Sequence, residues 1–86
     1  MEKEVEEVID KIRKFRKERN ISILNLSLES GVSRSHLFYI ESKTTIPSLE
    51  TLTKIAHAMD LQLKDFFIWL RSYAHSSLKS FRFGLF

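Results

Sequence analysis

The chain has no cysteine, one proline and two glycines among its 86 residues. The absence of cysteine excludes a disulfide framework and a thiolate metal site, and it fits a protein of the reducing cytoplasm. The scarcity of proline and glycine favours helices joined by short turns. No apolar run reaches the roughly 18 residues of a membrane-spanning helix, and no signal-peptide pattern opens the chain. We therefore expect a cytoplasmic protein without a membrane partner.

Sequence patterns of enzymes are also missing. The chain has no glycine-rich phosphate loop and no nucleophile within a recognisable catalytic motif. His36, His57 and His75 each lack a second histidine, cysteine or acid at metal-ligand spacing. We therefore expect no catalytic activity, no metal and no cofactor, and no small-molecule ligand is evident.

The length and composition of the chain are those of one small globular domain. Hydrophobic residues make up 43% and charged residues 29% of the chain, which is ordinary for a folded protein. Near the N-terminus apolar residues recur at helical spacing, which predicts an amphipathic helix over residues 3–19. They are Val5, Val8, Ile9, Ile12 and Phe15. With few turn residues and no strand pattern in this domain, we predict an all-α fold.

The centre of the sequence predicts two short helices joined at a glycine. Ser22 is a favourable N-cap for the first of them, and Gly31 can adopt the left-handed conformation that ends it. Ser33 then caps a helix in which Leu37 and Ile40 share one face. The other sides of this helix carry Arg34, Ser35, Phe38 and Tyr39. One face is therefore expected to be buried and another to be presented.

These motifs resemble the Cro- and lambda-repressor-like helix-turn-helix family, also called the xenobiotic-response-element family. The resemblance covers roughly residues 5–68 and depends on several segments in one order. They are residues 12–16, 21–22, 26, 30–35, 40–41, 47–52, 54–56 and 63–67. It implies a five-helix lambda-repressor-like DNA-binding domain over residues 1–68. Residues 69–86 would form a C-terminal helix extension and tail.

The resemblance also implies that the helix at residues 33–42 reads the major groove of double-stranded DNA. The base-contacting positions would be Arg34, Ser35 and Tyr39, with His36 and Phe38 beside them. Arginine can bond guanine through two hydrogen bonds, serine can bond several bases, and aromatic edges can contact thymine methyl groups. Alternatively, Phe38 and Tyr39 pack against a neighbouring chain.

Contacts to DNA phosphates are implied at helix starts and in the loop after residue 41. The candidates are Arg13, Ser22, Ile23, Ser33, Lys43, Thr44 and Thr45. Ile23 departs from the family, whose members commonly place a phosphate-binding glutamine there. Either the helix amides hold the phosphate unaided, or another part of the protein covers this face. The loop is also less basic than in relatives, which usually have glycine at the Lys43 position and bases at the next two.

The net charge of +3 conceals a polarised first helix. Residues 2–10 hold five acids and one lysine, whereas residues 11–19 hold six bases and one acid. Complementarity to the helix macrodipole accounts for most of this pattern, and positive potential toward nucleic acid is the other interpretation. In the family an arginine at the Arg16 position commonly pairs with the glutamate that is here Glu41. Otherwise the two are solvated charges that contribute at most about 1 kcal/mol.

The C-terminal half predicts two further helices. Ser48 is expected to cap a fourth helix with its apolar face toward the core, namely Leu49, Leu52, Ile55, Ala56 and Met59. A fifth helix is predicted over residues 63–75. The apolar groups beyond residue 68 exceed what a small core can bury, which indicates an interface. We expect a homodimer through Trp69, Leu70, Tyr73, Phe81 and Phe83, and membrane-surface binding of the basic, aromatic tail is the alternative.

The sequence thus predicts a sequence-specific DNA-binding transcriptional regulator of the small repressor or restriction-modification controller type. The alternative is a protein-interaction module, or an antitoxin-like protein that binds a partner, on the same fold with weak or no DNA binding. Ile23, Phe38, Tyr39 and the thinly charged loop motivate this alternative.

Overall fold

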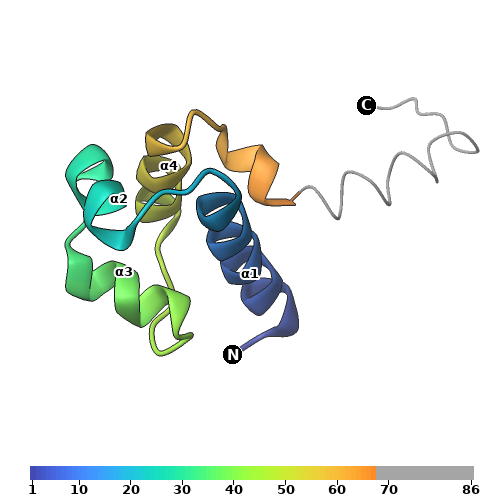
Figure 1. The fold of residues 1–86 in the computed structure, drawn as a ribbon. Helices are drawn as coiled ribbons and strands as arrows, with labels where there is room; N and C mark the ends of the chain where they lie inside the picture. Colours follow the sequence, from blue (N-terminus) through green and yellow to red (C-terminus); the bar gives the residue numbers. More distant parts are fainter. Residues whose placement is uncertain (68–86) are drawn as a thin grey trace, which may run out of the picture.

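The computed structural model describes residues 1–67. Within them the regular secondary structure is all helical, and there is no strand (Figure 1). The elements are α1 (Lys3–Glu18), α2 (Ile23–Ser30), α3 (Arg34–Glu41), α4 (Leu49–Ala58) and the 3₁₀ helix η1 (Leu63–Phe67). The all-α prediction is confirmed for this part of the chain. No helix in residues 1–67 is long and apolar enough to cross a membrane.

The predicted fifth helix differs from the structure where the two can be compared. Its first five residues, Leu63–Phe67, form a 3₁₀ helix instead of an α-helix. The remainder of that prediction lies outside the described residues. The same holds for the whole predicted dimer interface, namely Trp69, Leu70, Tyr73, Phe81 and Phe83.

Serine residues are the N-caps of three helices, as predicted. The hydroxyl oxygens of Ser22, Ser33 and Ser48 each accept a hydrogen bond from the backbone N–H three residues later, at 3.0, 3.1 and 3.1 Å. Gly31 ends α2 at φ 79, and a Cβ there would meet no atom within 4 Å. The glycine is therefore required by its left-handed backbone and not by crowding. Asn20 follows α1 at φ 55, also in the left-handed region.

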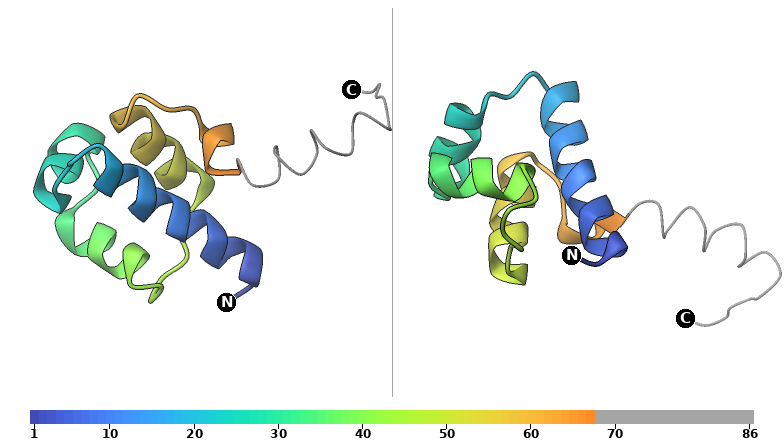
Figure 2. Two further views of the ribbon diagram at one scale, coloured as in Figure 1. Left: turned by 45° about the vertical axis from the view of Figure 1, so that its right-hand side comes forward. Right: turned by 90° about the horizontal axis from the view of Figure 1, so that it is seen from below.

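One apolar core joins all the helices. It consists of Val8, Ile9, Ile12, Leu26, Val32, Leu37, Ile40, Leu52, Ile55, Ala56, Met59 and Phe66. Helix α2 packs against α3 and α4, while α1 packs against α3 and η1 (Figure 2). The rings of Phe15 and Phe66 stack with 6.2 Å between centroids, so η1 is attached to α1. This packing fixes α2 and α3 relative to each other.

The prediction that Leu49 faces the core is wrong. Leu49 was expected to face the core but is 67% exposed, because it is the first residue of α4 and the buried face begins at Leu52. Leu49 contributes instead to an apolar groove of about 230 Å³ between the starts of α1 and α4. We call it the α1–α4 groove, and it is lined by Glu4, Val5, Val8, Ile46, Pro47, Leu49, Leu52 and Phe67.

Candidate nucleic-acid interface

Helix α3 lies on the outside of the bundle and presents one side to solvent (Figures 1 and 2). Leu37 and Ile40 are fully buried on its inner face. On its outer face Phe38 is 61% and Tyr39 50% exposed, and their rings meet edge to face with 5.8 Å between centroids. The division into a buried and a presented face follows the apolar spacing of the sequence.

Four of the five predicted base-contact residues line one shallow hollow with the start of α2. The hollow has a volume of about 380 Å³. We call it the α2–α3 hollow, and its lining is Ile23, Leu24, Arg34, Ser35, Phe38 and Tyr39. The fifth predicted residue, His36, is partly buried and does not line it. The hollow therefore combines two residues of α2, Ile23 and Leu24, with four residues of α3. The apolar spacing within either helix does not predict this combination.

The starts of α2 and α3 provide two candidate phosphate positions. The first-turn amides of a helix have no intrahelical acceptor, and together with the macrodipole they favour anions. The hydroxyl oxygens of Ser22 and Ser33 accept hydrogen bonds from backbone N–H groups. Each hydroxyl proton can therefore still be donated to a phosphate oxygen. Both serines are exposed, as a phosphate contact requires.

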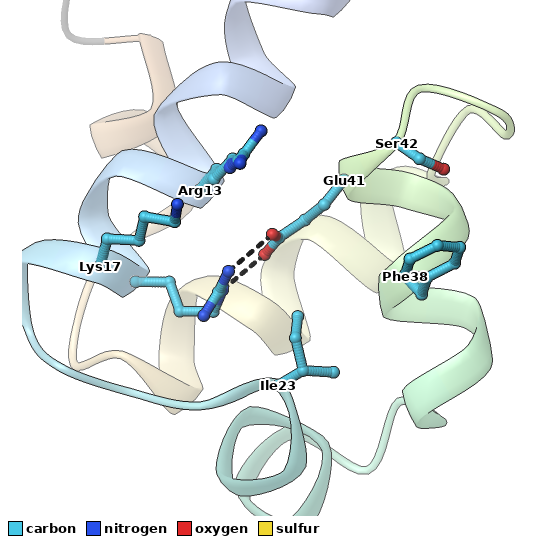
Figure 3. A pocket seen from close by; sticks show the side chains of 7 residues that line it. Arg13, Lys17, Ile23, Phe38, Glu41 and Ser42 are labelled. Atoms are coloured by element: carbon cyan, nitrogen blue, oxygen red, sulfur yellow. Dashed lines mark hydrogen bonds and ion pairs between the residues drawn. The ribbon is translucent and has the colours of Figure 1, made fainter.

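Arg16 and Glu41 form the pair that the resemblance implied. Arg16 donates from Nε to Glu41 Oε2 at 2.7 Å and from Nη2 to Oε1 at 2.9 Å (Figure 3). Its Nη1 donates to the backbone oxygen of Ile21 at 2.8 Å. The two side chains are 12% and 10% exposed. One guanidinium thus connects α1, the segment before α2 and the end of α3.

The pair lines a second hollow, of about 280 Å³, between α1 and α3 (Figure 3). We call it the α1–α3 hollow, and its lining is Arg13, Arg16, Lys17, Ile23, Phe38, Glu41 and Ser42. Arg13 and Lys17 are exposed and lie one helical turn apart on α1. Since Arg16 neutralises Glu41, these two cations give the hollow a positive charge. Ile23 and Phe38 line both hollows, so the two form one continuous surface.

The loop after α3 places its lysine against α1. Lys43 Nζ lies 3.0 Å from Asp10 Oδ1, with the two side chains 35% and 62% exposed. Thr44 Oγ1 shares a hydrogen bond with Ser42 Oγ at 2.9 Å, and Thr45 is partly buried. Asp10 and Lys43 are 33 residues apart in the sequence, and no local pattern predicts their contact. In this contact Asp10 would compete with a DNA phosphate for the Lys43 ammonium group.

The backbone explains why relatives prefer glycine at the Lys43 position. Lys43 has φ 63, in the left-handed region that glycine adopts without cost. A side chain with a Cβ loses about 1 kcal/mol there. Lys43 therefore lies at a position where a residue with a Cβ has an unfavourable backbone conformation.

The sequence profile of the helix-turn-helix family matches residues 12–66, which include α2, α3 and both members of the Arg16–Glu41 pair. This chain belongs to the helix-turn-helix family, of the Cro/C1 type. The recognition made from the sequence motifs is thereby confirmed.

Two relatives of this helix-turn-helix protein are known by name. The HTH-type transcriptional regulator SlrR of Bacillus subtilis (strain 168) is 40% identical over 57 residues, which cover 65% of this chain and 38% of the relative. The uncharacterized HTH-type transcriptional regulator y4dL of Sinorhizobium fredii is 34% identical over 58 residues, 67% of this chain and 30% of the relative. The match therefore covers only about a third of the length of each of these curated relatives. No solved structure matches it significantly.

Proposed function

We propose that this helix-turn-helix protein is a sequence-specific transcriptional regulator that inserts α3 into the major groove of double-stranded DNA. The observation that carries the proposal is the presented face of α3, where Arg34, Ser35 and Tyr39 stand exposed while the opposite face is buried in the core. Both named relatives are called transcriptional regulators, and they match the region that contains this helix.

In the proposed complex, phosphates flank α3 and base edges face it. Arg34 bonds a guanine through two hydrogen bonds, and Ser35 and Tyr39 contact the neighbouring bases. Phe38 and His36 approach the groove beside them. The phosphate contacts come from Arg13, Ser22, Ile23, Ser33, Lys43, Thr44 and Thr45, with Ile23 using its backbone amide.

We further propose a homodimer whose two α3 helices enter adjacent major grooves about 34 Å apart. The α1–α4 groove supports this proposal, because it is apolar and includes Phe67, which lies two residues before the predicted interface residues Trp69 and Leu70 in the sequence. The role we propose is that of a small repressor or a restriction-modification controller.

A protein-interaction module is the second candidate function. The observation that favours it is the apolar part of the same surface, where Leu24 is 47% exposed beside Phe38 and Tyr39. An antitoxin-like protein would bury such a surface against its partner.

Selection of bound fragments from random DNA, followed by gel-shift titration over a salt series, tests the proposed function. We expect one enriched motif and a binding constant that falls linearly with the logarithm of salt concentration. Absence of any shift at low salt would instead favour the interaction module.

Replacing Arg34 tests base recognition directly. Arg34→Ala should weaken binding to the selected site by about 1 to 3 kcal/mol and relax the preference at one base position. Lys43→Ala is the matched control, since a phosphate contact should affect all sequences alike and reduce the salt slope. Repeating the selection with both variants measures the difference. An Arg34→Ala protein that keeps both affinity and preferred sequence would show that α3 does not read bases as proposed.

Replacing Asp10 tests whether this acid competes with DNA for Lys43. Asp10→Asn should strengthen binding to all DNA sequences, by up to about fivefold, because an exposed ion pair contributes at most about 1 kcal/mol. Gel-shift titrations at low salt provide the measurement. In a Lys43→Ala background the same substitution should have no such effect. An equal gain in both backgrounds would mean that Asp10 acts through the general field and not through Lys43.

A further inference from the structure

The α2–α3 hollow combines few polar groups with a large exposed apolar surface. Leu24, Phe38 and Tyr39 are 47%, 61% and 50% exposed, and Ile23 is partly exposed beside them. Among the side chains that line the hollow, the polar groups are the Arg34 guanidinium, the Ser35 hydroxyl and the Tyr39 hydroxyl. Hydrogen bonding to bases therefore accounts for only the smaller, polar part of this surface and does not explain the larger apolar part.

The charges around the hollow favour a polyanion over an apolar protein segment. Among the residues that line the α2–α3 hollow there is no acid. The adjoining α1–α3 hollow adds Arg13 and Lys17, and its carboxylate, Glu41, is already bonded to Arg16 (Figure 3). The apolar groups thus stand next to cations and beside two helix N-termini.

This arrangement matches the distribution of groups in the DNA major groove. Phosphates line its rims, and base edges form its floor. The apolar group that the four standard bases offer on that floor is the C5-methyl group of thymine. The side chains of Phe38 and Ile23 line both hollows, next to the α1 cations, so we expect base edges to meet these side chains while the Ile23 backbone amide stays available to a phosphate.

We propose that the α2–α3 hollow is a binding site for pyrimidine C5-methyl groups, and that Leu24, Phe38 and Tyr39 select thymines in the recognised site. This inference rests on the proposed function, because it requires α3 to lie in the major groove. It adds an apolar determinant of specificity to the polar contact of Arg34, and it gives a role to the side chains of Ile23 and Leu24.

Replacing thymine by uracil in the selected site is the direct test, because it removes the methyl group and keeps base pairing. Each thymine whose methyl enters the hollow should lose about fourfold in affinity on conversion to uracil, as burial of one carbon group predicts. The wild-type chain is titrated against the site with every thymine converted singly. Thymines outside the protected region serve as controls.

Protein variants then assign the effect to the hollow. Phe38→Ala and Leu24→Ala should bind thymine and uracil sites equally well. Leu28→Ala is the matched control, because Leu28 is 72% exposed on α2 but does not line the hollow. Arg34→Ala should bind more weakly while it retains the preference for thymine. All four replaced side chains are exposed, and unchanged thermal unfolding would verify that the variants fold.

The outcomes separate this inference from the proposed function. Site-specific binding with no thymine-to-uracil difference overturns the methyl site and leaves the proposed function standing. A difference that persists in both Phe38→Ala and Leu24→Ala also overturns it, since the methyl contact would then lie elsewhere. If no DNA is bound at any salt concentration, the proposed function fails and the inference fails with it.

Discussion

Removing either member of the Arg16–Glu41 pair should lower the free energy of unfolding by about 3 kcal/mol. The side chains are only 12% and 10% exposed, so a single deletion leaves a charge with little access to water. Arg16→Ala also removes the hydrogen bond to the Ile21 oxygen, whereas Glu41→Ala leaves the guanidinium without its two acceptors. Denaturant titration of each variant measures the loss.

The double variant should lose less free energy of unfolding than the sum of the two single losses, because it leaves no buried charge without a partner. An exposed pair provides the matched control. Lys54 Nζ and Glu50 Oε2 are 3.9 Å apart with side chains 53% and 81% exposed, so its removal should cost at most about 0.5 kcal/mol. Additive losses in the Arg16 and Glu41 cycle would contradict the proposed coupling.

The same pair should matter for DNA binding, because it determines the position of α3. Glu41 is the last residue of α3, and Arg16 attaches it to α1 and to the segment before α2. Without the pair, the end of α3 keeps the buried packing of Ile40 and the exposed Lys43–Asp10 contact of the following loop, but it loses its two bonds to Arg16. The ion pair therefore connects the stability of the fold with the placement of the proposed base-reading face.

Local chemistry accounts for the features that the sequence predicted well. Ser22, Ser33 and Ser48 cap helices because a serine side chain satisfies an amide three residues later, and Gly31 tolerates a left-handed backbone. Such signals depend on a few neighbouring residues and are visible without a structure. The Arg16–Glu41 pair, by contrast, was inferred from the family resemblance and not from any local pattern.

Features that depend on tertiary packing escaped prediction. Leu49 follows the apolar pattern of α4, yet its place at the helix start leaves it 67% exposed. The contact between Asp10 and Lys43 arises only when the loop after α3 reaches α1. Both cases concern where the ends of elements lie, which periodicity does not determine.

Ile23 was the departure that left two interpretations open, a phosphate held by amides alone or a face covered by other parts of the protein. Within residues 1–67 it is partly buried against the core, yet it still lines both hollows, so that part of the chain leaves some of its side chain uncovered. The first interpretation is therefore compatible with the fold, and the side chain remains available for an apolar contact.

Truncation after residue 68 should convert a dimer into a monomer and reduce affinity for a two-half-site operator by about 100-fold or more. The second domain of a dimer docks at high effective concentration once the first has bound, and a monomer loses this gain. The loop after α3 carries one lysine, so each single domain should bind weakly. Affinity for a single half-site should change little.

Sedimentation of the full chain and of the truncated chain, together with titration of both operator types, measures these effects. The core of residues 1–67 includes Phe66, so the truncated protein should keep its helical content, which circular dichroism verifies. A full-length variant with Trp69→Ala and Leu70→Ala should reproduce the loss without truncation, and Arg34→Ala should remain dimeric. An unchanged dimer after truncation would place the interface elsewhere on the molecule. A full-length chain that sediments as a monomer at high micromolar concentration would refute the dimer itself, and the weak phosphate contacts of one domain would then have to suffice alone.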